Sequence, residues 1–293
     1  MDEHFGDNLV AAIARKRAPV CVGLDPVYER LPGPLRKAFR NDRIGALGEF
    51  CRQVLTVVAP IVPAVKIQIA YFEIYQSRGV GLYNEIVAFA RELDLLVIGD
   101  VKRGDIGPSA EAYAAGHLRA TNGPDAVTVS GYFGDDGLIP FIEAGAEGGK
   151  GIFVLVRTSN PSAAAVQDFV GTDGQRFYEH MAEQVATIGG GEELIGSSGY
   201  SRVGAVVGAT YPQEARRLRE IMPRQIFLVP GYGAQGATAA DCAAAFKGDG
   251  TGAIVNASRS VIFAYERHRQ ADWKQAIEAA GRAFAKDLAS VVL

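Results

Sequence analysis

Cysteine is scarce in this chain. Only Cys21, Cys51 and Cys242 occur among 293 residues, and no two of them form a Cys-x-x-Cys pair. Disulfide frameworks and zinc sites are built from paired or closely spaced cysteines. We therefore expect neither here, and a reducing, cytoplasmic environment fits this composition best.

The chain also lacks the features that bind nucleic acid or lipid. Its 30 Lys and Arg against 33 Asp and Glu give a net charge of −3, with no basic block. Binding to a phosphate backbone needs clustered basic residues. No apolar run approaches the ~18 residues of a membrane span, and the opening "MDEHFGDNLV" does not read as a signal peptide. We expect neither nucleic acid nor a membrane as a partner.

The chain contains many short apolar runs that are rich in Val and Ile. They are nearly continuous rather than alternating, which is typical of parallel strands covered on both faces. They predict strands at 18–25, 62–70, 95–103, 125–133, 151–159, 203–210, 226–233 and 252–260.

Helical patterns fall between these runs. Apolar residues at three- and four-residue spacing predict helices at 44–59, 82–94, 108–121, 212–222 and 271–292. Strands that alternate with helices in this way predict an α/β fold, a (β/α)₈ or TIM barrel, whose usual length is ~250 residues. We expect one domain over residues 1–293, with a doubly wound open sheet as the runner-up.

Two segments are longer than a barrel requires. They are 26–43, rich in proline and arginine, and 159–202, with a predicted helix near 174–188. Both follow predicted strands. We therefore expect both to lie at the C-terminal face, where barrel enzymes carry their sites.

The stretch "LLVIGDVKRGDIGPSA" (95–110) places charges where a buried strand ends. Asp100 and Lys102 are two apart, so on a strand they face the same side, and Asp105 follows beyond it. One interpretation is a salt bridge at the barrel rim, worth little. The other is a lysine kept protonated by carboxylates and able to deliver a proton. Lys66, inside "PAVKIQIA", favours the second, because a buried lysine needs a carboxylate partner.

A second cluster lies in "LVPGYGAQGA" (228–237) and "VNASRS" (255–260). Barrels often bind phosphate with the loops after strands seven and eight. Gly231, Gly233 and Gly236 can expose backbone N–H groups, Gln235 adds an amide, and Arg259 offers a planar donor fork. The alternative is a tight turn beside a surface arginine. The coincidence with the expected pair of strands favours phosphate.

The histidines do not suggest a metal site. His4, His117, His180 and His268 lie in or beside predicted helices, and none sits at a strand end. We expect no metal site built on them, so acid–base work falls to lysine and aspartate.

The run from Asp100 to Ile106, "DVKRGDI", resembles the signature of the orotidine 5′-phosphate decarboxylase family. "PGYGAQG" and "NASRS" are similar to its phosphate-binding segments, and "VGLDP" and "AVKIQIAYFE" to its first two strands. The resemblance spans residues 22–263 and points to the longer, bacterial-type branch. "SGYFG" (130–134) departs from the Asn-Pro-Tyr expected there. Members convert orotidine 5′-monophosphate to uridine 5′-monophosphate in pyrimidine synthesis, without metal or organic cofactor.

The resemblance implies roles for individual residues. Lys102 would donate a proton to C6 of the pyrimidine, Asp100 would sit beside the substrate carboxylate, and Asp105 would reach the partner's site in a homodimer. The remaining implied contacts are Asp25 and Lys66 to the ribose, Ile106 beside Asp105, Ser109 to the substrate, Ser159 or its neighbour Thr158 to the pyrimidine, and Gln235, Arg259, Gly231, Gly233, Gly236 and Ser258 to the phosphate.

Other functions stay open at this stage. Related barrels share an Asp-x-Lys-x-x-Asp strand but act on sugar phosphates with Mg²⁺. A Schiff-base aldolase using Lys66 or Lys102 is a further enzyme hypothesis. A barrel that binds nucleotide without catalysis is the hypothesis of a different class.

Overall fold

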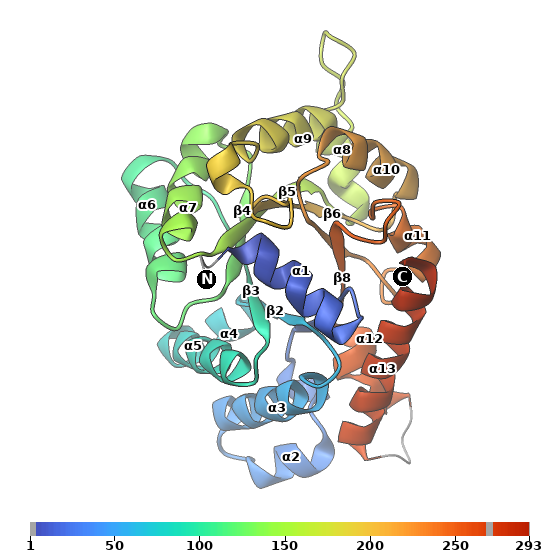
Figure 1. Ribbon diagram of the computed structural model, residues 1–293. Helices are drawn as coiled ribbons and strands as arrows, with labels where there is room; N and C mark the ends of the chain where they lie inside the picture. The colour runs from blue at the N-terminus through green and yellow to red at the C-terminus, as the bar shows by residue number, and fades with distance from the viewer. Residues whose placement is uncertain (1–3, 268–271, 293) are drawn as a thin grey trace.

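The computed structural model describes residues 4–267 and 272–292. Within them, eight parallel strands pair in chain order and close into a barrel surrounded by helices (Figure 1). Pairing of Val20 with Val255 joins the last strand to the first and rules out an open sheet. Each predicted strand contains an observed one, so the predicted barrel is confirmed. The strands are β1 (Val20–Leu24), β2 (Ala64–Gln68), β3 (Leu96–Arg103), β4 (Ala126–Ser130), β5 (Gly151–Arg157), β6 (Val203–Val207), β7 (Phe227–Pro230) and β8 (Ala253–Ala257).

Helices pack around the barrel because their apolar faces cover the outer side chains of the strands. All the predicted helices are found, although the predicted helix 108–121 divides into α6 and a π-helical turn at Ala115–Arg119. The start of the last predicted helix, residue 271, and His268 lie outside the described residues. The helices after α1 are α2 (Gly33–Ala38), α3 (Arg43–Val58), α4 (Ala70–Glu73), α5 (Gln76–Glu92), α6 (Gly107–Ala114), α7 (Asp135–Glu147), α8 (Ala164–Gln167), α9 (Phe177–Ile188), α10 (Pro212–Ile221), α11 (Ala239–Ala243), α12 (Arg259–Ile262) and α13 (Trp273–Val292).

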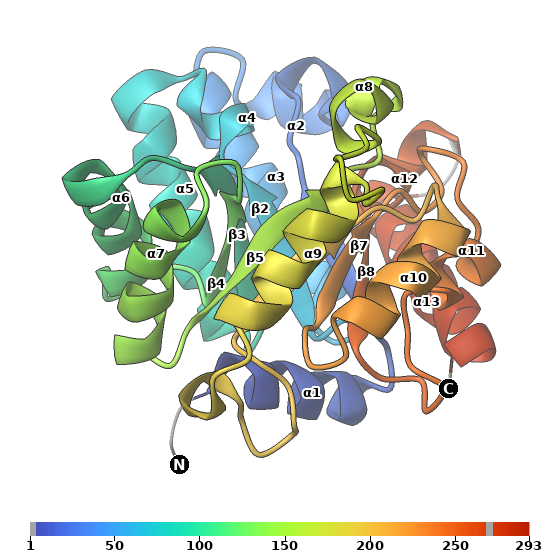
Figure 2. The same ribbon diagram turned by 90° about the horizontal axis from the view of Figure 1, so that it is seen from above.

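Helix α1 (Phe5–Lys16) lies across the N-terminal end of the barrel (Figures 1 and 2). Phe5 and Leu9 are one helical turn apart, so they share a face, and both are buried. They belong to the apolar cluster that fills the barrel interior, where Phe5 meets Phe153 edge to face at 5.7 Å between ring centroids. The N-terminal end is therefore plugged, and a site can open only at the other end.

The segment 189–202, between α9 and β6, lies against α1. The Asp7 carboxylate accepts hydrogen bonds from the backbone N–H groups of Ser197 (2.8 Å) and Ser198 (2.7 Å). The prediction that all of 159–202 lies at the C-terminal face was therefore wrong for this part. Helix α9 runs back along the barrel, so the chain reaches the N-terminal end before β6 begins (Figure 2).

Helix α7 was not predicted from the sequence. Gly137, Pro140 and Gly145 interrupt its apolar pattern, and proline in particular is a poor signal for a helix interior. None of the helices among the described residues is long and apolar enough to cross a membrane.

Candidate active site

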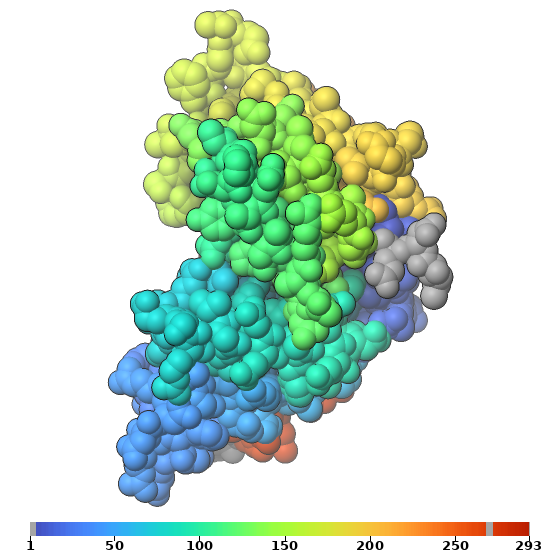
Figure 3. All heavy atoms as spheres, turned by 90° about the vertical axis from the view of Figure 1, so that its left-hand side faces the viewer, coloured from blue at the N-terminus to red at the C-terminus, as the bar shows by residue number. Residues whose placement is uncertain are grey.

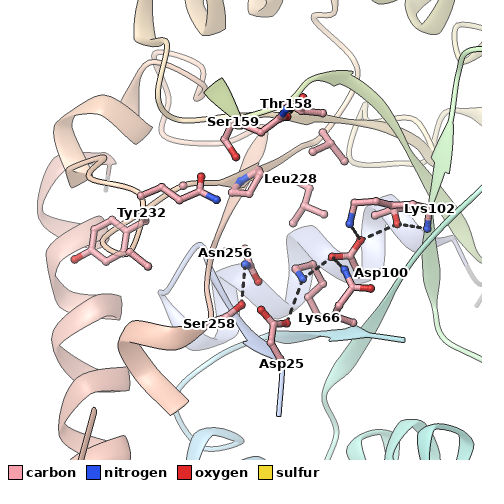
Figure 4. A pocket seen from close by; sticks show the side chains of 18 of the residues that line it. Asp25, Lys66, Asp100, Lys102, Thr158, Ser159, Leu228, Tyr232, Asn256 and Ser258 are labelled. Carbon is pink, nitrogen blue, oxygen red and sulfur yellow. Dashed lines mark hydrogen bonds and ion pairs between the residues drawn. The ribbon is translucent and has the colours of Figure 1, made fainter. Parts of the chain in front are cut away.

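A cavity of about 480 Å³ opens at the carboxyl ends of the strands, a size typical of small-ligand sites. Figure 4 shows that charged side chains gather on one side of it, with Tyr232, from the loop after β7, on the opposite side and Ser258, just after β8, beside Asp25. The lining residues are Asp25, Lys66, Gln68, Tyr71, Asp100, Lys102, Thr128, Leu155, Thr158, Ser159, Asn160, Val206, Leu228, Pro230, Gly231, Tyr232, Ala234, Gln235, Asn256, Ser258 and Arg259.

Four charges alternate in sign along one side of the cavity. We call Asp25, Lys66, Asp100 and Lys102 the charge array. Lys66 Nζ lies 2.7 Å from Asp100 Oδ2 and 3.9 Å from Asp25 Oδ1. Lys102 Nζ donates a hydrogen bond to the other oxygen of Asp100. The side chains come from β1, β2 and β3, neighbours whose inward positions meet at this end.

The Asp100 carboxylate is saturated with donors. Its Oδ2 accepts from Lys66 and from Gln68 Nε2 (2.9 Å), and its Oδ1 accepts from Lys102 and from Thr128 Oγ1 (3.0 Å). The residue is only 5 % exposed. A buried carboxylate held by four donors is fixed in place, and the cavity has a negative charge at a defined point.

Burial and charge act in opposite directions on these groups. Burial raises the pKa of Asp100, but the two lysine ammonium groups outweigh it and hold that pKa well below its usual range. Burial lowers the pKa of Lys66, but Asp100 and Asp25 outweigh it and raise that pKa above its ordinary value. Both groups are therefore charged across the neutral range.

The backbone at Lys102 is unusual. Its φ is +44°, in the left-handed region that non-glycine residues rarely adopt, and the pairing of β3 with β4 shifts between Gly99 and Arg103. Thr128 Oγ1 accepts a hydrogen bond from the Lys102 N–H at 3.0 Å. The prediction that Asp100 and Lys102 face the same side is confirmed, and Thr128 holds both of them.

The opposite side of the cavity is more open to solvent. Gly231, Gly233 and Gly236 all have positive φ, between 69° and 122°, which glycine adopts without strain. They shape the loop after β7, where Gln235 lines the cavity, and Arg259 lines it at the start of α12. An amide and a guanidinium at an open rim suit an anionic group such as phosphate.

A family model described as "Orotidine 5′-phosphate decarboxylase / HUMPS family" matches residues 18–273. The chain belongs to this family. It is 43% identical over 292 residues to an orotidine 5′-phosphate decarboxylase of Rhodopirellula baltica, covering 94% of this chain and 96% of the relative. It is 42% identical over 264 residues to one of Deinococcus radiodurans, covering 90% and 91%. The solved structure of Leishmania donovani OMP decarboxylase superposes with a TM-score of 0.77 at 30% identity, covering 98% of both chains.

Most residues singled out from the sequence for this family's chemistry line the one cavity. The structure brings together Asp25, Lys66, Asp100, Lys102, Ser159, Gly231, Gln235, Ser258 and Arg259, and both Thr158 and Ser159 take part. Gly233 and Gly236 belong to the same loop but do not line the cavity.

Asp105, Ile106 and Ser109 stand apart from this cavity. Asp105 accepts a hydrogen bond from the Ile106 N–H at 2.8 Å, and the Ile106 side chain is exposed to solvent. Ser109 is exposed on α6. Their implied roles within the family stay predictions.

Gln68, Thr128 and Asn256 line the cavity but were not singled out from the sequence; Thr128 and Asn256 are buried, and Gln68 is half-buried. Gln68 lies two residues after Lys66, Thr128 two before Ser130, and Asn256 two before Ser258. The two-residue period of a strand, applied along β2, β4 and β8, would have found all three.

No cluster of three or more His, Cys, Asp or Glu side chains within residues 4–267 and 272–292 is arranged to hold a metal ion.

Proposed function

We propose that this protein is an orotidine 5′-phosphate decarboxylase, which converts orotidine 5′-monophosphate to uridine 5′-monophosphate and CO₂. The observation that carries the proposal is the charge array, placed opposite a phosphate-type rim in one cavity. Family membership and the printed names of the relatives support it.

In this mechanism the bond between C6 and the carboxylate breaks and its electron pair stays on C6. No neighbouring group of the ring delocalises that pair, so the reaction needs the upper part of the ~8–23 kcal/mol by which enzymes lower barriers. Lys102 supplies a fixed positive charge where the negative charge develops, and then transfers a proton from Nζ to C6. Asp100 lies beside the leaving carboxylate and disfavours the bound ground state.

The rest of the substrate is held at a distance from the bond that breaks. Asp25 and Lys66 take the ribose, Ser159 the pyrimidine, and Gln235 and Arg259 the phosphate, with Ser258 and the glycines of the β7 loop (Gly231, Gly233 and Gly236) beside it. Binding energy from such remote contacts can be used to orient the reacting group.

The test is turnover of orotidine 5′-monophosphate by purified protein in the presence of EDTA. We expect loss of the orotate absorbance with stoichiometric release of CO₂. Binding without turnover would instead support a nucleotide-binding protein. Turnover of a sugar phosphate that depends on Mg²⁺ would support the other enzyme class, which the names of the curated relatives do not favour.

We further propose a homodimer in which Asp105 completes the partner's site, with Ile106 and Ser109 beside it. Asp105 does not line its own cavity. The segment that follows it, through α6 and α7, lies on the side of the molecule that faces the viewer in Figure 3 and carries exposed apolar side chains. These are Ile106, Tyr113, Tyr132, Phe133 and Ile139. Apolar groups gathered in this way are typical of protein interfaces.

Mixing two inactive variants tests the shared site. In a heterodimer of Asp105→Ala and Lys102→Ala, one site carries both defects and the other carries neither. Random exchange should therefore restore about a quarter of wild-type activity for a two-fold dimer. A mixture that stays inactive after proven exchange of subunits would place Asp105 in its own site.

We place the reaction in the cytoplasm. The three cysteines are buried and unpaired, as is usual in a reducing compartment.

A further inference from the structure

Asn256 is a buried amide in the cavity that the assigned contacts do not use. It lies on β8, is 7 % exposed, and lines the cavity. Its Nδ2 donates to Ser258 Oγ at 3.4 Å, whereas its Oδ1 is buried and has no hydrogen-bond partner among the described residues. Buried acceptors are nearly always paired. An unpaired one in a ligand cavity calls for a donor from the ligand.

The neighbouring strand is shaped to accommodate this amide. Gly23 lies on β1, which pairs with β8. A Cβ atom at Gly23 would lie 3.0 Å from Asn256 Oδ1 and only 1.9 Å from Ser258 Oγ. Any side chain on β1 at this point would therefore displace the polar groups of β8, and glycine leaves them room inside the cavity.

A second unpaired acceptor lies on the same side. Asp25 Oδ1 is buried without a hydrogen-bond partner among the described residues, and the nearest ammonium, Lys66 Nζ, is 3.9 Å away. Figure 4 shows Asn256, Ser258 and Asp25 in succession along the cavity wall. Two acceptors thus await donors in the same part of the cavity.

The position of these acceptors identifies the group that they suit. They are carried by β8 and by the residue after β1, and in the closed barrel these two strands lie between β7, whose loop belongs to the rim that suits phosphate, and β2 and β3, which carry Lys66 and Lys102. In a nucleotide, the part between phosphate and base is the sugar, and a ribose carries two hydroxyl donors. The carboxylate of Asp25 and the amide oxygen of Asn256 match that pair of donors in number and kind.

We propose that Asn256 is a sugar-binding residue whose Oδ1 accepts a hydrogen bond from a ribose hydroxyl of the nucleotide. This inference rests on the proposed function, because the orientation of the nucleotide follows from it. It assigns to β8 a part in recognising the sugar of the nucleotide.

The test compares three ligands in two proteins. Wild type and Asn256→Leu, in which leucine keeps the branched shape, are titrated calorimetrically with uridine, 2′-deoxyuridine and 3′-deoxyuridine 5′-monophosphate. In wild type, removing the hydroxyl that Asn256 binds should weaken binding about tenfold, the effect of one lost hydrogen bond. In Asn256→Leu the same removal should have less than about a twofold effect, because the partner is already gone.

Two further variants guard against a simple loss of structure. Asn256→Asp keeps an acceptor in place and should still distinguish the hydroxyl, even if an added charge weakens binding of all three ligands. Gln225→Met removes another buried amide whose Oε1 is unpaired, next to β7 but outside the cavity. It should leave the discrimination unchanged.

Two results would overturn the inference: a wild type that binds all three ligands equally, or an Asn256→Leu variant that discriminates as strongly as wild type. Equal weakening of all three ligands in Asn256→Leu is a case of the second result. The variant would then discriminate as wild type does, and Asn256 would only shape the cavity. Failure of the proposed function is a separate result, since the wild type would then not decarboxylate orotidine 5′-monophosphate.

Discussion

The two ends of this barrel are built from the same strands and differ in almost every property. At the N-terminal end, α1 inserts Phe5 and Leu9 into an apolar interior, and the Asp7 carboxylate is fully paired with the 197–198 segment. At the C-terminal end, charges line an open cavity, and the acceptors on Asp25 and Asn256 have no donors among the described residues. The paired Asp7 stabilises the fold, whereas these acceptors of Asp25 and Asn256 face a cavity that a ligand can enter. The N-terminal end therefore contributes mainly to stability, and the C-terminal end contributes mainly to chemistry.

The largest effect should follow from removing the proton donor. Lys102→Ala should lower kcat by at least ~10⁴-fold, because it loses both a general acid and a charge that stabilises the transition state. The free energy of unfolding should change by only about 1 kcal/mol, since the lysine side chain is 48 % exposed and Asp100 keeps its other donors.

Steady-state kinetics and urea unfolding of the same preparation measure both quantities. Lys37→Ala, at an exposed lysine on α2, is the matched control and should change neither. If Lys102→Ala kept more than about a tenth of wild-type kcat, Lys102 would not be the acid.

The opposite pattern should follow at the N-terminal end. Leu9→Ala removes a fully buried side chain of α1 and should cost about 3 kcal/mol of unfolding free energy, through lost burial and a residual cavity. The kcat should be unchanged, because α1 does not line the active-site cavity.

Leu228→Ala makes the same deletion where the side chain does line that cavity. It should destabilise the fold by a similar amount and also raise KM. The two-end comparison fails if the Leu9 variant, while still folded, loses as much activity as the Leu228 variant.

The barrel was predictable because its strands are buried on both faces. The run 18–25 contains β1 (Val20–Leu24), and the run 226–233 contains β7 (Phe227–Pro230). Both predicted runs extend beyond the strand at each end, over 18–19 and Asp25 in the first and over Ile226 and 231–233 in the second. Apolar composition measures burial, and a strand end is set by backbone pairing that composition does not record.

The site was only partly predictable, for a related reason. Asp100 and Lys102 were found because charges are conspicuous at the end of an apolar run. Thr128 and Asn256 were missed because a neutral polar side chain in a strand is an ordinary feature of a sequence. Their role depends on neighbours on the adjacent strand, and such a neighbour is separated from them along the chain by many residues, as Asp100 on β3 is from Thr128 on β4. The role of Asp105 depends on a second chain, so only the family resemblance suggests it.

A smaller effect should come from the side chain that holds the charge array. Thr128→Val is nearly isosteric and removes the hydrogen bonds to Asp100 Oδ1 and from the Lys102 N–H, both 3.0 Å. Without them the left-handed backbone at Lys102 loses a restraint. We expect kcat to fall about tenfold with KM little changed, and the free energy of unfolding to fall by about 1 kcal/mol.

Thr56→Val is the control for the substitution itself, since the exposed Thr56 on α3 donates a hydrogen bond to the backbone carbonyl of Arg52 and does not line the cavity. Its kcat should equal that of wild type. A rise in KM without a fall in kcat for Thr128→Val would mean that the threonine supports binding and not the position of Lys102.

The smallest effect concerns Asp7, and pH reveals it. Burial raises the pKa of this carboxyl, but the hydrogen bonds from Ser198 and Ser197 together outweigh it and lower the pKa to about 2. In the unfolded chain the pKa is near 3.9, so the unfolded state binds the proton first as pH falls. The stabilisation is therefore complete above about pH 4 and is lost between pH 4 and pH 2. Because the side chain is partly exposed, we expect a contribution of about 1 kcal/mol to the free energy of unfolding.

Urea unfolding of wild type and Asp7→Asn at several pH values measures this contribution. The two curves of unfolding free energy against pH should be separated by this amount at neutral pH and converge near pH 2, with equal kcat at pH 7. A constant separation down to pH 2 would show that the charge of Asp7 does not stabilise the plugged end.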